Sequence, residues 1–243
     1  MDFEEIKKKT KIFVKEELLT LEPWILNVEW EEKLPKLKEL RNKAKSEGLW
    51  LPQIPTAYGG LGLTNAQHGE VSEILGASPY GHYCLNCQAP DAGNMEILIE
   101  FGTDHQKETY LYPLLKGEIR SCFAMTEPDH AGSNPVKMGT IATKENGNYV
   151  INGHKWFTSG FDGATFAIVM LVTDPEGKNP HKKASQVIVP TSTEGVEFVR
   201  NVSIMGHSSS GWESHAEIKF HEVKVPLCNV LGGDGEGFTI AQK

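Results

Sequence analysis

The chain has 243 residues and a formal net charge of −8, with 24 lysines and arginines against 32 aspartates and glutamates. This acidic balance excludes nucleic acid as the main partner, because phosphate binding requires clustered basic side chains. Hydrophobic residues make up 39% and charged residues 23%, as in globular proteins. No stretch approaches the roughly 18 apolar residues of a membrane span. The charged N-terminus and the four cysteines favour a cytoplasmic location.

Helical periodicity fills the chain up to about Gly117. Apolar residues at spacings of three, four and seven predict a first amphipathic helix: Phe3, Ile6, Phe13, Val14, Leu18 and Leu21. A second helix is expected over residues 34–44, and Gly48 is placed to end it. Three further helices are predicted: Gln67–Leu75, Ala92–Phe101 and His105–Leu115. The glycines and prolines of residues 54–64 predict a loop.

Strand patterns begin at about Glu118. Thr140–Lys144 and Tyr149–Asn152 flank a turn expected at Gly147–Asn148. Three more strands are predicted: Phe166–Val172, Gln186–Val189 and Ala216–Phe220. Helices followed by strands predict an α+β fold, in which an N-terminal α-helical domain precedes an antiparallel β-barrel or sandwich. The expected boundaries are residues 1–118 and 119–231, and residues 232–243 would begin a further helical domain.

Several residue clusters invite a chemical interpretation that the sequence does not support. His82, Cys84 and Cys87 have no obvious fourth metal ligand, so no metal site is predicted. The glycines of residues 59–62 and 232–237 lack the context of a phosphate-binding motif, which favours turns. The serines of residues 208–210 follow His207 without a nucleophile elbow, which favours a polar loop.

Two segments are better candidates for a site. Ser121–Asn134 (SCFAMTEPDHAGSN) is an apolar run that ends in a turn, where backbone N–H groups and small hydroxyls can approach a flat polar ring or a phosphate. Gly153–Gly160 (GHKWFTSG) sets an aromatic pair beside Thr158 and Ser159. Taken separately, the first segment is only a strand and a loop, and for the tryptophan of the second segment a core position is the commoner case.

Together these segments resemble the acyl-CoA dehydrogenase family. The order CFAMTEP…GS, INGHKWFTSG and EIKFHEVKVP…NVLGGDGEGF follows the family's central β-domain, and SEGLWLPQIPTAYGGLGLT is similar to its helical part. NCQAPDAGNMEILIEFG resembles the subgroup that includes human members ten and eleven. The resemblance implies an FAD-dependent oxidoreductase of fatty acid metabolism. It would carry out α,β-dehydrogenation of an acyl-CoA, with hydride transfer to flavin N5.

The resemblance also implies which residues hold the cofactor. The implied FAD contacts are Phe123, Met125, Thr126, Gly132, Ser133, Trp156, Phe157 and Thr158. Thr126 would bond the pyrimidine edge, Trp156 would cover the far face of the flavin, and Thr158 would lie near N5. Gly132 and Ser133 would hold the pyrophosphate, and Ser133 would also contact the phosphate side of acyl-CoA. This loop has one residue more than the commonest family loop, and Asn134 replaces the usual aspartate.

No catalytic residue is assigned, because the family's base belongs to a third, helical domain that is expected to be absent from these residues. Glu127 is the one substitute, and in the family its position belongs to a structural turn. The implied partners are acyl-CoA, an electron-transferring flavoprotein, and either further copies of the chain or a second polypeptide that supplies the third domain. The alternative is a non-catalytic, truncated relative that acts as a binding protein.

Overall fold

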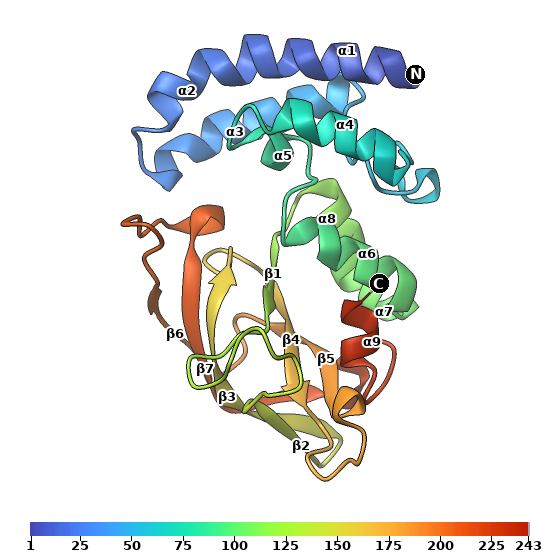
Figure 1. The fold of residues 1–243 in the computed structure, drawn as a ribbon, viewed down its shortest axis with the longest axis vertical. Coiled ribbons are helices and arrows are strands. Elements are labelled where there is room, and N and C mark those ends of the chain that lie inside the picture. Colours follow the sequence, from blue (N-terminus) through green and yellow to red (C-terminus); the bar gives the residue numbers. More distant parts are fainter. Residues whose placement is uncertain (243) are drawn as a thin grey trace. The chain divides into compact units, whose positions relative to one another are not determined.

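The computed structural model describes residues 1–242, which form helices followed by a β-sheet (Figure 1). The chain divides into two compact units, one from Met1 to Ala92 and one from Gly93 onward. The domain boundary predicted near residue 118 stays a prediction.

The first unit is helical. Its elements are α1 (Phe3–Phe13), the π-helical turn η1 (Val14–Leu18), α2 (Leu19–Ile25), α3 (Trp30–Ser46), the 3-10 turn η2 (Thr56–Tyr58), α4 (Asn65–Leu75) and α5 (Gly81–Cys84). The predicted apolar stripe is buried, since Ile6, Phe13 and Leu18 are each at most 4% exposed. Gly48 takes the left-handed conformation with φ +73° just after α3, so it ends this helix as predicted.

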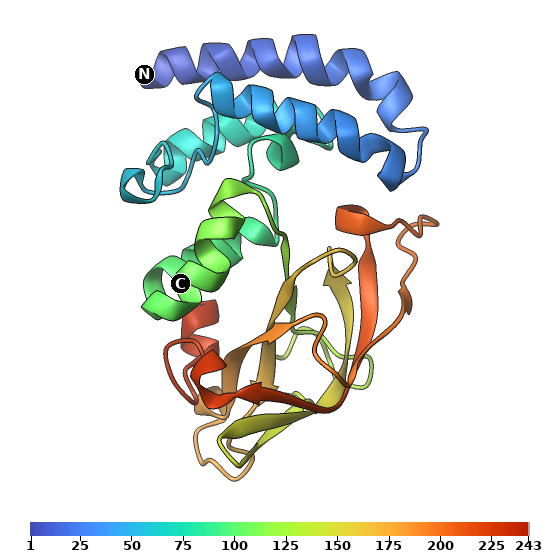
Figure 2. The same cartoon turned by 180° about the vertical axis from the view of Figure 1, so that it is seen from behind.

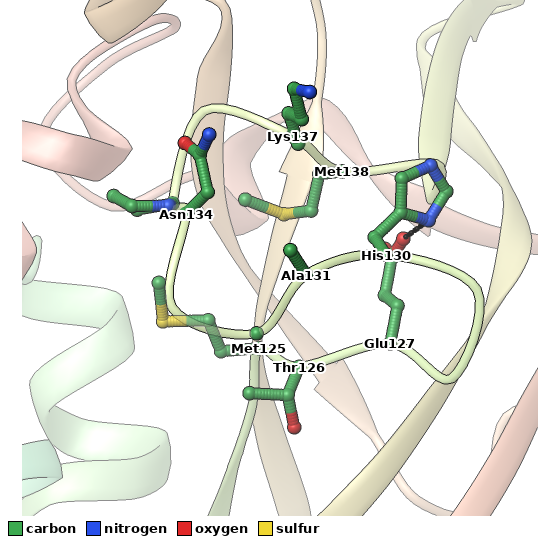
Figure 3. Close-up of a pocket in the computed structure, with 10 residues that line it drawn as sticks. Met125, Thr126, Glu127, His130, Ala131, Asn134, Lys137 and Met138 are labelled. Carbon is green, nitrogen blue, oxygen red and sulfur yellow. Dashed lines mark ion pairs between the residues drawn. The ribbon is translucent and has the colours of Figure 1, made fainter.

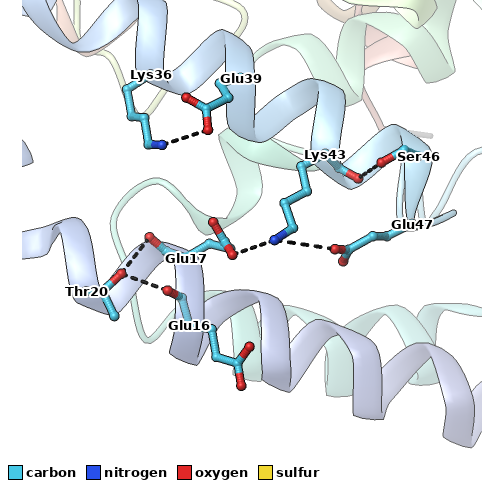
Figure 4. A network of polar contacts seen from close by, with 8 residues as sticks. All are labelled: Glu16, Glu17, Thr20, Lys36, Glu39, Lys43, Ser46 and Glu47. Carbon is cyan, nitrogen blue, oxygen red and sulfur yellow. Dashed lines mark hydrogen bonds and ion pairs between the residues drawn. The ribbon is translucent and has the colours of Figure 1, made fainter.

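Polar contacts at the surface of this unit run along α3, and one of them joins α3 to η1 (Figure 4). Lys43 binds Glu17 at 2.5 Å and Glu47 at 3.8 Å. Exposed pairs of this kind contribute about 0–1 kcal/mol. Arg41 is different, because it is buried, donates to Asn86 Oδ1 at 2.8 Å and lies 4.8 Å from the ring centre of Trp50. The unit is therefore held by its apolar stripe and by one buried arginine.

The second unit combines short helices with the sheet. Its helices are α6 (Asp91–Phe101), α7 (Asp104–Gln106), the π-helical turn η3 (Lys107–Leu111), α8 (Tyr112–Lys116) and α9 (Gly237–Ala241). Its strands are β1 (Ser121–Ala124), β2 (Ile141–Glu145), β3 (Asn148–Ser159), β4 (Phe166–Val172), β5 (Ala184–Pro190), β6 (Val196–Asn201) and β7 (His215–Pro226). The short 3-10 turns are η4 (Pro180–Lys182), η5 (Gly211–Glu213) and η6 (Leu227–Asn229).

The strands form one strongly curled sheet in the order β1-β4-β2-β3-β7-β6, with β5 paired to the other side of β4 (Figure 2). This confirms the predicted α+β fold, with one correction. The sheet is mixed rather than purely antiparallel, because β1 runs parallel to β4. The β2–β3 turn lies at Asn146–Gly147, one residue earlier than predicted, and β6 was not predicted.

Buried polar side chains fix the helices to the sheet. Asn94 Nδ2 of α6 donates to Ser121 Oγ at 2.9 Å and to the carbonyl of Cys122 at 3.1 Å. Gln106 Nε2 of α7 donates to the carbonyls of Cys228 and Val230. The two bonds of Asn94 hold α6 against β1, which matters for the cavity described below.

The glycine-rich segment 232–237 is a turn, as predicted. Asp234 accepts from the Tyr149 hydroxyl at 2.5 Å, and Gly235 N donates to Ser185 Oγ at 2.9 Å. Gln186 Nε2 donates to the carbonyl of Gly237 at 3.1 Å. The turn thereby places α9 against β5, and both views show α9 beside α6 and α7.

Gly237→Ala is expected to destabilise the chain by about 1–3 kcal/mol, because overpacking forces backbone shifts. An added Cβ would lie 2.7 Å from the Ser185 carbonyl carbon and 2.8 Å from the Ala184 oxygen, both fixed in β5. The matched control is Gly233→Ala, whose Cβ would meet nothing within 4 Å. Urea unfolding should show a change within about 0.5 kcal/mol for this control. Equal effects of the two substitutions would contradict the packing of α9 on β5.

Candidate functional site

The two segments singled out in the sequence lie side by side. Trp156 N donates to the Thr126 carbonyl at 3.0 Å, and Thr126 Oγ1 donates to the Trp156 carbonyl at 2.8 Å. Lys155 Nζ donates to the Met125 carbonyl at 2.7 Å. The end of β1 and the end of β3 are therefore joined by three hydrogen bonds. This junction brings Phe123, Met125 and Thr126 close to Trp156.

A bulge in β3 presents the aromatic pair. The register between β3 and β7 shifts between Lys155 and Thr158. Phe157 has φ +49°, a left-handed conformation that is uncommon for an aromatic residue. Its ring centre lies 4.8 Å from that of Trp156, and Phe157 is 40% exposed. Bulges next to binding sites redirect side chains in this way.

An apolar cavity of about 470 Å³ opens beside β1. It is lined by Gly93, Glu96, Ile97, Glu100, Phe101, Phe123, Met125, Ile240 and Ala241. Two predicted flavin contacts, Phe123 and Met125, thus face a space of the size that small ligands occupy. Burial raises the pKa of Glu96 above its usual value. This helix face was not identified from the sequence, because its carboxylates look like those of any solvated helix.

The loop that carries Gly132 and Ser133 folds back beside the turn Thr126–Pro128, the TEP turn (Figure 3). Both residues are exposed on this loop. Gly132 and Thr126 line the same small pocket, and a Cβ on Gly132 would lie 3.5 Å from the Thr126 methyl group. The structure therefore brings Gly132 next to Thr126. Ser133 does not line this pocket.

Glu127 and Lys155 form a buried ion pair at the base of that loop. Lys155 is fully buried, Glu127 is 4% exposed, and Lys155 Nζ lies 2.9 Å from Glu127 Oε1. Burial works against charge on Glu127, but Lys155 and the N–H donors outweigh it, so the pKa of Glu127 lies below its usual value. For Lys155, burial prevails over the attraction of Glu127 and lowers the pKa to about 8. The contact of 2.9 Å favours the charged form of each partner.

Both oxygens of Glu127 are occupied by protein donors. Oε1 also accepts from Thr140 N at 2.8 Å, and Oε2 accepts from Gly139 N at 2.5 Å. His130 Nδ1 lies 2.9 Å from Oε2. A carboxylate held in this way is not available to remove a proton from a substrate. The geometry supports the structural interpretation of Glu127.

Thr158 carries a hydroxyl that the fold leaves unpaired. Its side chain is fully buried, and within residues 1–242 its Oγ1 has no hydrogen-bond partner. An unsatisfied buried hydroxyl costs about 1–3 kcal/mol. A bound polar ring that hydrogen-bonds this hydroxyl would remove that cost. The apolar cavity fits a flat ring such as that of a flavin, and Thr158 is not among the residues that line it.

Cys84 and Cys87 are buried in the helical unit. Burial raises the pKa of the Cys84 and Cys87 thiols to about 12. In the part of the chain that the structure describes, no three His, Cys, Asp or Glu side chains converge as metal ligands. Over the same residues, no helix is long and apolar enough to cross a membrane.

Two models of known protein families match most of the chain. Residues 2–118 match the model of the acyl-CoA dehydrogenase N-terminal domain, and residues 122–223 match that of the acyl-CoA dehydrogenase middle domain. The chain belongs to the acyl-CoA dehydrogenase family.

Relatives within the acyl-CoA dehydrogenase family are similar over most of this chain. Acyl-CoA dehydrogenase family member 10 of Mus musculus is 43% identical over 215 residues, which are 86% of this chain and 20% of that protein. Family member 11 of Homo sapiens is 36% identical over 249 residues, which are 98% of this chain and 32% of that protein. A solved acyl-CoA dehydrogenase from Geobacillus kaustophilus is 25% identical with a TM-score of 0.76, over 99% of this chain and 60% of that one. The chain spans less than two thirds of each relative.

Lys155 was not recognised as a site residue from the sequence, although a signal was present. Lys155 lies two residues beyond Gly153 and four beyond Ile151. Because side chains alternate along a strand, all three residues share its inward face. That alternation indicates a buried lysine, and a buried lysine requires a buried acid.

Glu127→Gln is expected to lower the free energy of unfolding by about 3–5 kcal/mol at pH 7, because Lys155 loses its buried counter-charge and the cost of burying or deprotonating its ammonium is no longer offset. The folded-state pKa of Glu127 lies below the ordinary 4.5, so its stabilisation is present above that pH. The stabilisation is lost as pH falls through the folded-state pKa, and the difference from the unaltered chain should shrink there.

Urea unfolding between pH 3 and pH 7 measures this difference. The control is Glu17→Gln, which breaks the surface contact with Lys43 and should cost at most about 1 kcal/mol. A difference for Glu127→Gln that stays constant with pH would contradict the charged pair.

Proposed function

We propose that this chain is the FAD-binding part of an acyl-CoA dehydrogenase that oxidises an acyl thioester between Cα and Cβ. The observation that carries the proposal is the junction of the turn Thr126–Pro128 with the β3 bulge, where the Thr158 hydroxyl is buried and has no hydrogen-bond partner among residues 1–242. A bound FAD would serve as the hydride acceptor, taking the hydride from Cβ at its N5 atom. The residues of this chain bind the ring, exclude water from it and supply hydrogen bonds.

Each residue has a role that its surroundings support. Trp156 and Phe157 would cover the ring and keep water away from it. Phe123 and Met125 would contact it from the cavity side. Thr126 already donates its hydroxyl proton to Trp156, so this oxygen would serve the pyrimidine edge as an acceptor.

Gly132 and Ser133 would hold the pyrophosphate from the exposed loop, with Ser133 also toward acyl-CoA. Backbone N–H groups of such loops bind phosphates well. The loop begins and ends at the buried Glu127 pair, which favours a defined loop position.

No catalytic base is assigned within these residues, because Glu127 is engaged by protein donors. We propose that the base comes from the third, helical domain of the family. That domain would be part of the same complete enzyme or of a second polypeptide. Acyl-CoA is the proposed substrate, and an electron-transferring flavoprotein is the proposed electron acceptor.

Visible absorption tests this function. The purified chain, mixed with FAD, should show a protein-bound flavin band that does not bleach when a saturated acyl-CoA is added without oxygen. Addition of a C-terminal helical half from a family member should allow bleaching. If FAD binds neither to the chain alone nor to the chain with the added C-terminal half, the proposal is overturned. Binding without bleaching in both would favour the non-catalytic alternative.

Thr158→Val is expected to stabilise the FAD-free chain by about 1 kcal/mol, because it removes an unpaired buried hydroxyl. The same change should weaken FAD binding by about tenfold, the effect of one lost hydrogen bond. The contrasting variant is Thr126→Val, which removes a bond to Trp156 and should lower the stability of the FAD-free chain. Urea unfolding and fluorescence titration measure the two effects. Loss of stability in FAD-free Thr158→Val would show that the hydroxyl has a protein partner.

A further inference from the structure

Three segments distant in sequence meet at Lys155. Its ammonium contacts the Met125 carbonyl at 2.7 Å and Glu127 Oε1 at 2.9 Å. Through Glu127 it also reaches the N–H groups of Gly139 and Thr140, where the loop 128–138 ends. The end of β1, both ends of this loop and the bulge of β3 therefore share one buried charge pair.

Stability alone does not account for a lysine here. A buried ion pair can be replaced by packed apolar side chains with little loss of stability and often with a gain. Apolar side chains, however, cannot bind a carbonyl and two N–H groups at the same time. What the pair adds is a fixed distance between the loop and the bulge.

We propose that Lys155 is a positioning residue for the cofactor, because it holds the ring-facing bulge and the phosphate-facing loop at one fixed separation. The inference rests on the proposed function, in which Trp156 to Thr158 contact the ring and Gly132 and Ser133 contact the pyrophosphate. Lys155 itself touches neither part. It acts through Met125 and Glu127.

This role has a signature that mere loss of stability does not produce. FAD uses both the ring site and the loop, whereas riboflavin has the ring and no phosphate. Release of the loop should therefore weaken FAD binding more than riboflavin binding. General destabilisation of the fold would weaken both ligands together.

The experiment is a fluorescence titration of the full chain with FAD and, separately, with riboflavin. For Lys155→Met we expect the ratio of FAD affinity to riboflavin affinity to fall about tenfold, the effect of one charge-assisted hydrogen bond. Hydrogen exchange at Gly139 and Thr140 should accelerate in the same variant, because their acceptor loses its fixed place.

The matched control is Val223→Ala. Val223 is fully buried in β7 and lies opposite Ile151, four residues along β3 from Lys155. This substitution creates a cavity and lowers stability without touching the charge pair. It should leave the affinity ratio unchanged. If Lys155→Met does not fold, the double variant Lys155→Met/Glu127→Gln, which has no unpaired buried charge, is titrated for the same ratio.

The outcomes separate the two proposals. If the unaltered chain binds neither FAD nor riboflavin, the proposed function is overturned and the inference with it. If the unaltered chain binds FAD and the Lys155 variant keeps the same affinity ratio, the inference is overturned and the function stands. A ratio that falls equally in Val223→Ala also overturns the inference.

Discussion

Two opposite charges without access to water constrain the whole site, because neither Glu127 nor Lys155 can be left unpaired. Each polar group around them comes from a different segment, namely the Met125 carbonyl at the end of β1 and the N–H groups of Gly139 and Thr140 before β2. The chain cannot bury this pair without bringing these segments to β3. Loop, turn and strand are thus fixed by one electrostatic requirement, and the cavity beside β1 forms next to this fixed point.

The bulge of β3 changes which side chains of this strand face inward. Period-two alternation would place Phe157 on the same inward face as Lys155, and Thr158 on the outward face. The register shift reverses this, since Phe157 is 40% exposed and Thr158 is fully buried. The left-handed backbone of Phe157 costs about 1–2 kcal/mol. The paired bonds between Trp156 and Thr126 hold the strand in this conformation.

The sequence predicted what depends on local periodicity and on motifs. The amphipathic stripe of α1 and the end of α3 at Gly48 follow from spacing alone. The neighbouring positions of the segments Thr126–Pro128 and Trp156–Ser159 follow from the family resemblance. The parallel pairing of β1 with β4 was missed, because strand direction depends on the path of the intervening chain. Strand β6 was missed because its central residues are all exposed, which leaves no alternation to detect. The bulge and the Lys155 contacts arise from tertiary packing, so no single segment reveals them.

The features that suit a ligand are those that do not help the chain to fold. The unpaired Thr158 hydroxyl, the left-handed Phe157 and the apolar cavity of about 470 Å³ each lower the stability of the ligand-free chain. A ligand that fills this cavity binds the folded state alone. At 100 times its dissociation constant, such a ligand stabilises the fold by about 2.7 kcal/mol. The ion pair and the β-sheet maintain the site's geometry without a ligand, and binding offsets the cost of that geometry. On the proposed function, folding and FAD binding would therefore be coupled through residues 123–158.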